Sequence, residues 1–249
     1  KIFMKIIQLT LFTAIFTISI CHAQEYKASL FGCVSDGITN NTSSIQAAID
    51  YIAEKGGGKL NFYVGRYLTG GLVLKSNVTI ELHEGAILVA SSNINDFILY
   101  DNERALLFGN NLANVSIIGK GVIEANPKQY FLTTDALKRK QLLQPGYLAH
   151  TPSLLTMVNC SNVKVEGIIF QQSLQYAQKY ISCNHIDLSN QIIRNNTVEN
   201  SGSVVFQNTK SIALKNIFID AKGQAIIKDQ HSEITMMENC INPNGKPVL

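Results

Sequence analysis

Asn162-Val163-Lys164-Val165 is one of six stretches in which a polar residue is followed by alternating apolar positions. The others are Asn77-Val78-Thr79-Ile80, Asn114-Val115-Ser116-Ile117, His185-Ile186-Asp187-Leu188, Ser211-Ile212-Ala213-Leu214 and Glu233-Ile234-Thr235-Met236. The last four of the six motifs begin 23, 26 and 22 residues apart. Self-similarity at such a steady period is typical of a solenoid, in which each repeat buries its apolar face only by stacking on its neighbours.

The repeats are predicted to be β-strands, because their apolar residues recur at every second position and Val, Ile, Thr and Phe dominate them. Further short apolar stretches precede and follow the motifs, such as Ser153–Val158 and Gly167–Phe170 around Asn162. Three short strands and three turns per repeat are typical of one coil, that is, one full turn, of a parallel β-helix. The sequence therefore predicts an all-β fold, a single-stranded right-handed parallel β-helix.

A helix is expected to cap the N-terminal end of this solenoid. Ile45, Ala48, Ile49 and Ile52 share one helical face, with Thr42 or Ser43 as N-cap and Gly56-Gly57-Gly58 as the stop. An amphipathic helix folded over the first coil would cover its open apolar end.

One turn of the coils also repeats a polar residue. Asn111, Asn159 and Asn208 lie four residues before the first apolar position of a motif, and Ser182 and Gln230 take this place in two other coils. A polar residue kept in register suggests a ladder of stacked side-chain amides. The alternative is the ordinary preference of Asn for turns.

Composition favours one globular domain. The 249 residues include 21 basic and 18 acidic side chains, and neither a linker nor a charged tail is evident. We expect residues 24–249 to form a single β-helix domain that is incomplete at its C-terminal end. The formal net charge of +3 gives no general attraction to nucleic acid.

Residues 1–23 have the pattern of a signal peptide, with Met4 as the start and cleavage after Ala23. The apolar run within this segment is too short to span a bilayer comfortably. A secreted or periplasmic protein without a membrane span is therefore expected. A lipoprotein anchored at Cys21 is the less favoured alternative, because Ile20 fits that motif poorly.

Four cysteines follow this segment, namely Cys33, Cys160, Cys183 and Cys240. Cys160 and Cys183 each lie three residues before a first apolar position, so we expect them on neighbouring coils. Parallel neighbours in register are a strained geometry for a disulfide, so buried free thiols are favoured, although secretion leaves bridges open. The sequence shows no Cys-x-x-Cys and no His cluster with metal-ligand spacing, so neither a metal nor another cofactor is expected.

Several motifs point to a known family. These are Phe31-Gly32-Cys33-Val34-Ser35-Asp36-Gly37, Gly119-Lys120-Gly121-Val122-Ile123-Glu124 and Thr151-Pro152-Ser153-Leu154-Leu155. With them the chain resembles, over about residues 28 to 240, the polygalacturonase-like proteins of glycoside hydrolase family 28, within the pectate-lyase-like β-helix group. The resemblance implies the same fold and a pectic, galacturonan-like polysaccharide as substrate.

The resemblance also implies hydrolysis with inversion, which needs a carboxylic acid and a carboxylate about 6.5 to 9.5 Å apart. The family marks are Asn-Thr-Asp, Asp-Asp, Gly-His-Gly and Arg-Ile-Lys on successive coils. Here Gly202, Gly223 and Gln224 replace the catalytic aspartates, Gly245 falls near Gly-His-Gly, and no Arg-Ile-Lys precedes Leu249. Neither a glycine nor a glutamine amide transfers a catalytic proton, so whether this chain is an enzyme stays open.

Nearby residues are candidates for displaced roles. Asp229, Asp220 and Glu199 lie within a few residues of the lost aspartates and could supply a catalytic carboxylate; the competing interpretation is a solvated turn residue. Lys228, Lys222 and Arg194 are candidates for binding uronate carboxylates, and Lys228 alone matches a basic position of the family.

Three functions are thus compatible with the sequence. The first is a pectin-directed hydrolase that is catalytically impaired or represented by an incomplete chain. The second is a non-catalytic β-helix that binds pectic or related glycans, and the third is a structural or adhesive surface protein. Self-association through an open C-terminal coil is a further expectation, because such a coil exposes apolar surface and an unpaired strand edge.

Overall fold

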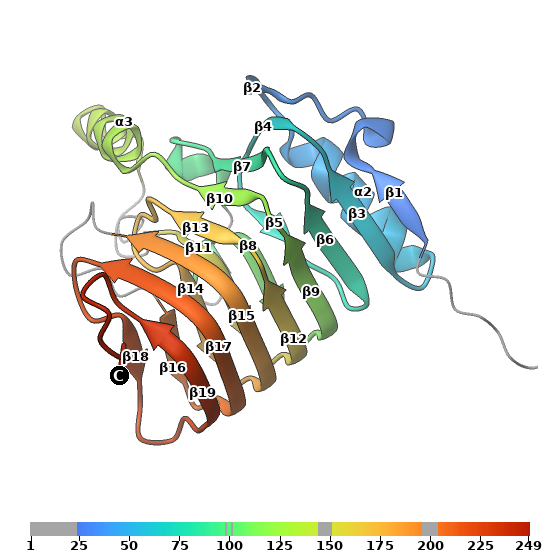
Figure 1. The fold of residues 1–249 in the computed structure, drawn as a ribbon. Helices are drawn as coiled ribbons and strands as arrows, with labels where there is room; N and C mark the ends of the chain where they lie inside the picture. The colour runs from blue at the N-terminus through green and yellow to red at the C-terminus, as the bar shows by residue number, and fades with distance from the viewer. Residues whose placement is uncertain (1–23, 98, 101, 144–150, 196–203) are drawn as a thin grey trace, which may run out of the picture.

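The computed structural model describes residues 24–97, 99–100, 102–143, 151–195 and 204–249. In these residues, parallel strands wind around one axis (Figure 1). Successive coils contribute strands to three faces, so the predicted parallel β-helix is confirmed. Two faces form a 13-stranded sheet and the third is a six-stranded sheet. The expected signal peptide, residues 1–23, lies outside the described residues.

The 13-stranded sheet bends into two limbs. The motif limb holds the six motifs and contains β1 (Glu25–Lys27), β3 (Gly58–Phe62), β6 (Val78–Leu82), β9 (Ala113–Gly119) and β12 (Ser161–Glu166). The trailing limb contains β2 (Asp36–Asn40), β4 (Gly65–Thr69), β7 (Ala86–Ala90), β10 (Val122–Glu124) and β13 (Ile169–Gln171). The long strands β15 (Asn184–Asn195), β17 (Lys210–Ala221) and β19 (Ile234–Ile241) run through both limbs.

The six-stranded sheet closes each coil. Its strands are β5 (Leu72–Val73), β8 (Ala105–Asn110), β11 (Ser153–Val158), β14 (Gln178–Ile181), β16 (Val204–Gln207) and β18 (Ile226–Lys228). The chain therefore turns from the trailing limb into this sheet and from this sheet into the motif limb, once per coil.

The motifs stack in register, as the period predicts. Val163 pairs with Val115 on one side and with Ile186 on the other, and Ile186 pairs with Ile212. All four side chains are buried, because alternate residues of each strand point into the coil. Stacking identical apolar positions along the axis builds one continuous core.

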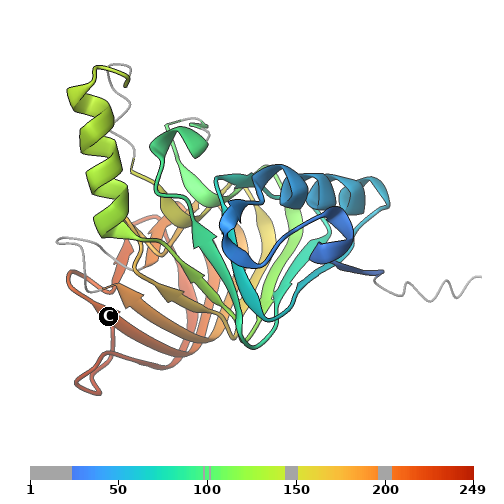
Figure 2. The same ribbon diagram turned by 90° about the horizontal axis from the view of Figure 1, so that it is seen from above.

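Helix α2 (Thr42–Glu54) covers the N-terminal end of the coils (Figure 2), and its four predicted core residues are buried. The expected N-cap at Thr42 or Ser43 is wrong, because the helix already begins at Thr42 and Asn41 precedes it. The Asn41 side chain instead bonds the backbone of Val34, accepting from its N–H and donating to its carbonyl. This side chain therefore fixes the incoming loop rather than the helix end.

Amide ladders exist, but in other columns than expected. Asn114 donates to Asn77 and Asn162 donates to Asn114, at the first residue of each motif. A second ladder joins Asn239, Asn216 and Asn190. The column predicted to form a ladder contains Asn111 and Asn159, whose backbone φ is 56° and 51°. The ordinary preference of Asn for turns therefore describes this column. The recorded side-chain hydrogen bond within it runs from Asn208 to Ser182.

The cysteines in the described residues are free and buried, as favoured. Cys160 and Cys183 lie on adjacent coils, and the Cys160 N–H donates to the Cys183 sulfur at 3.4 Å. The hydrogen bond with Cys160 and burial raise the pKa of the Cys183 thiol. Burial likewise raises the pKa of Cys33 to about 11, so the Cys33 and Cys183 thiols are poor nucleophiles.

A second helix, α3 (Pro127–Arg139), was not predicted. It follows β10 and projects beyond the coils (Figure 2), with the Asn126 side chain accepting from Gln129 N–H as its N-cap. Tyr130 is buried and packs edge-on against Phe97, with ring centroids 6.4 Å apart. Within the described residues, neither this helix nor any other combines the length and apolarity needed to cross a membrane.

Candidate functional site

The family positions fall at the edge where the trailing limb turns into the six-stranded sheet. Gly223 and Gln224 lie in the turn between β17 and β18, and both are exposed to solvent. Gly202, which the resemblance places at the first aspartate position, and the candidate Glu199 lie outside the described residues. The turn thus presents an amide and a bare backbone where the resemblance implies carboxylates.

A row of polar residues leads to this edge. Glu124 pairs in register with Gln171, Gln171 with Arg194, and Arg194 with Asp220, so four successive coils contribute one residue each. The residue before each of them, Ile123, Phe170, Ile193 or Ile219, is buried in the core. Since neighbouring side chains on a strand point to opposite faces, the polar row points outward, with a spacing of about 4.8 Å between coils.

Glu124 is fully engaged within this row. Arg66 Nη2 donates to Glu124 Oε1 and Gln171 Nε2 donates to Oε2, each at 2.6 Å. The Glu124 side chain is only 11% exposed. Because both oxygens are bonded in a sheltered place, Glu124 joins three coils together and is not available as a catalytic acid.

The structure brings three of the candidates together at the edge. Arg194 is exposed and lies beside the half-buried Asp220 in register, and the Lys222 N–H donates to the carbonyl of Asn195 at 3.2 Å. Lys222 is exposed in the same turn as Gln224. Two cationic side chains and one carboxylate therefore lie around the turn that holds Gly223 and Gln224.

The other two described candidates lie at the opposite end of β18, past its last residue or at it. Lys228 is the exposed last residue of β18, in register with Phe206. Asp229 follows it and accepts hydrogen bonds from the N–H of Asn208 at 2.9 Å and from the Ser232 hydroxyl at 2.7 Å. β18 therefore separates this pair of residues from Asp220 and Lys222.

The Asp229 carboxylate serves a turn. The Ser232 hydroxyl bond, with N–H donors from Asn208 and His231, lowers the pKa of Asp229. A general acid needs a raised pKa and a good base needs one near the working pH. The geometry thus agrees with the competing interpretation of Asp229 as a turn residue.

A charged pair on the six-stranded sheet was missed by sequence reasoning. Lys179 Nζ lies 2.6 Å from Glu103 Oε1, with side-chain exposures of 14% and 21%. Lys179 is the outward residue between the buried Gln178 and Tyr180 of β14. That alternation marks Lys179 as an outward charge, but nothing local links it to Glu103, 76 residues earlier.

The comparisons with known proteins agree with this architecture. The family model described as glycosyl hydrolases family 28 matches residues 59–245. The chain belongs to this family. A crystal structure from Parabacteroides merdae, of a protein assigned as a glycosyl hydrolase, is 32% identical with a TM-score of 0.85, and the match covers 91% of this chain and 99% of that one. The family and the β-helix expected from the sequence are therefore confirmed.

Two curated relatives are similar to parts of this chain. An exo-poly-alpha-D-galacturonosidase of Dickeya chrysanthemi is 33% identical over 113 residues, which is 39% of this chain and 18% of the relative. Plasmin and fibronectin-binding protein A of Streptococcus pneumoniae is 30% identical over 154 residues, 58% of this chain and 20% of the relative. The chain thus spans a third or less of the length of the curated relatives it matches.

Proposed function

We propose that this family 28 protein binds a galacturonan-like polysaccharide at the edge formed by Arg194, Asp220 and Lys222, and that it hydrolyses the chain poorly or not at all. The observation that carries the proposal is the exposed turn with Gly223 and Gln224. Its amide and backbone cannot donate or accept the catalytic proton, whereas the cations beside it can still hold a uronate.

The chemistry of the edge suits an acidic sugar chain. A guanidinium binds a carboxylate through two parallel hydrogen bonds, and an ammonium adds a compact positive charge. Arg194 and Lys222 are both exposed and come from adjacent coils. Side chains repeated every coil along the axis could contact successive sugar units of one polysaccharide.

A secreted or periplasmic location belongs to the same proposal, since a pectic polysaccharide is found outside the cell that degrades it. It depends on residues 1–23, whose signal-peptide pattern is a prediction.

Binding and turnover can be measured separately on the chain from Gln24 onward. We expect saturable binding of polygalacturonate by calorimetry, weakened about tenfold in Arg194→Ala/Lys222→Ala as charged hydrogen bonds are lost. Lys210→Ala is the matched control, because Lys210 is an exposed cation at the opposite end of β17. Unchanged binding in the double variant, or no binding by the parent chain, would contradict the proposal.

Residual hydrolysis is the second candidate function, favoured by the position of Asp220 next to Arg194 at the family edge. A reducing-end assay with polygalacturonate decides between the two functions. Turnover that disappears in Asp220→Asn or Asp229→Asn would establish a displaced catalytic carboxylate. Binding without release of reducing ends favours the non-catalytic function.

A further inference from the structure

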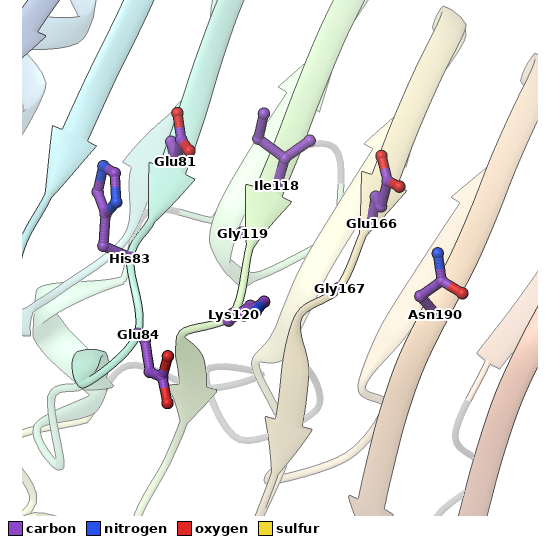
Figure 3. A pocket seen from close by; sticks show the side chains of 9 residues that line it. All are labelled: Glu81, His83, Glu84, Ile118, Gly119, Lys120, Glu166, Gly167 and Asn190. Atoms are coloured by element: carbon purple, nitrogen blue, oxygen red, sulfur yellow. The ribbon is translucent and has the colours of Figure 1, made fainter.

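A groove of about 660 Å³ lies at the bend between the motif limb and the trailing limb (Figure 3). It runs across β6, β9, β12 and β15, with Glu81, Ile118 and Glu166 in register on one side and Asn190 one residue further along, in the column of Gly119 and Gly167. Glu84 and Lys120 stand at the bend, and Gly119 and Gly167 lie between them and the row. The groove begins where the trailing strands start, whereas the family edge lies where those strands end.

The groove exists because an amide ladder stops there. The bend is made on successive coils by Gly119, Gly167, Asn190, Asn216 and Asn239, all with positive φ. In the last three coils the Asn side chains fill the bend and bond one another at 3.0 and 3.1 Å. In the two preceding coils glycine has no side chain, so the same place is hollow.

Coil stacking keeps those two positions as glycine. A Cβ on Gly167 would meet the Gly119 carbonyl oxygen at 2.1 Å, and a Cβ on Gly119 would meet the Leu82 carbonyl oxygen at 2.1 Å. The hollow is thus a fixed feature of the backbone and cannot be closed by a larger side chain without moving the coils.

The last amide of the ladder is open toward the hollow. Each ladder Asn donates its Nδ2 to the Oδ1 of the preceding coil, so Asn216 donates to Asn190. At the next position Gly167 has no side-chain acceptor, and within the part of the chain that the structure describes no acceptor is recorded for Asn190 Nδ2. A ligand oxygen beside Gly167 would take the place of the missing rung.

The charges of the groove select the kind of ligand. Three carboxylates, those of Glu81, Glu84 and Glu166, line the groove together with Lys120. Lys59 lies 2.8 Å from Glu81 and Lys164 lies 2.6 Å from Glu166, outside the lining, while Glu84 and Lys120 are exposed. With Lys59, Lys164 and Lys120 counted, three cations offset the three carboxylates, so the groove has no net charge that would attract a uronate. Its carboxylate oxygens accept hydrogen bonds from the hydroxyl groups of a neutral sugar.

We infer that this groove binds a neutral oligosaccharide, at a site separate from the proposed galacturonan edge. A sugar ring would lie on Ile118 and the glycine backbone, with its hydroxyl groups donating to Glu84 and Glu166. Asn190 and Lys120 would donate to its oxygens. Since the groove spans four coils, it is long enough for several sugar units in a row.

The test is calorimetric titration of the chain with two neutral probes, cellotetraose and galactotetraose, and with tetragalacturonate. We expect saturable binding of a neutral tetraose that weakens about tenfold or more in Glu84→Ala/Glu166→Ala, because hydrogen bonds to charged groups are lost. Glu238→Ala is the matched control, since Glu238 lies in the same register column as Glu166 and also pairs with a lysine, Lys215, at 3.2 Å.

Ile118→Arg provides a second variant that places a large side chain in the groove beside its register partner Glu166, and it should abolish binding of the neutral probe. Thermal melting by circular dichroism confirms that the variants remain folded. The inference is overturned if neither neutral tetraose binds at millimolar concentration, if Glu238→Ala weakens binding equally, or if the groove variants impair tetragalacturonate binding instead.

Discussion

Replacement of Gly167 by alanine tests the close approach of the coils at the bend. Gly167 has φ of +78°, and its Cβ would come within 2.1 Å of the Gly119 carbonyl oxygen. A left-handed backbone costs an L-residue roughly 1–2 kcal/mol, and overpacking adds typically about 1–3 kcal/mol. The free energy of unfolding should therefore fall by about 2–5 kcal/mol. At roughly 2–4 °C per kcal/mol for a chain of this size, Tm falls by about 4–20 °C.

Gly245→Ala is the control for the backbone part of this cost. Gly245 has a similar φ of +71°, but nothing lies within 4 Å of its added Cβ. Only the left-handed penalty of roughly 1–2 kcal/mol should remain. Scanning calorimetry of both variants isolates the steric part as a difference. Equal losses would refute the reasoning and would mean that the coils can separate at the bend without cost.

Three further outcomes follow from packing, charge and strand edges. Tyr180→Phe leaves the buried Gln178 Oε1 without its 2.7 Å donor and should cost about 1–3 kcal/mol in urea unfolding, whereas the control Tyr51→Phe, at a ring 41% exposed, should be near neutral. Because the pKa of Asp229 is lowered in the folded state, its carboxylate stabilises the fold at pH values above the ordinary pKa of 3.8, and this contribution is lost as pH falls through the folded-state pKa. Asp229→Asn should therefore lower Tm at neutral pH and make Tm decline less steeply below about pH 5. Met236, 46% exposed on β19, should promote self-association, so light scattering should show a concentration-dependent mass that Met236→Lys reduces; a monomer at all concentrations would contradict this.

The period of the motifs was enough to predict the coils, because stacking requires the same residue pattern at every turn. It also predicts the neighbourhood of Arg194 and Asp220, which are 26 residues apart, one coil length. The bend could have been found in the same way, since Gly119, Gly167, Asn190 and Asn216 each lie four residues after the first apolar position of a motif. The side-chain ladders lie in turns other than the predicted one, because Asn recurs in three columns and the sequence does not show which column has its side chains within bonding distance.

Other parts of the site depend on contacts that no period announces. Lys179 and Glu103 meet across 76 residues because the segment before β8 reaches over to β14. Helix α3 interrupts the repeat between β10 and β11, where the apolar alternation stops. The role of Asp229 was also hidden, since a carboxylate that bonds a turn and a carboxylate that catalyses look alike until their donors are known.

The buried thiols divide the solenoid along its axis. Cys33 lies at the capped end, Cys160 and Cys183 lie on central coils, and Cys240 lies on the coil of β19. Each coil is held mainly by its two neighbours, so coils can open from an end without melting the middle. A thiol reagent would consequently label these cysteines in the order in which their coils open. The labelling rate of each native cysteine would therefore report how fast its part of the solenoid opens, without any introduced probe.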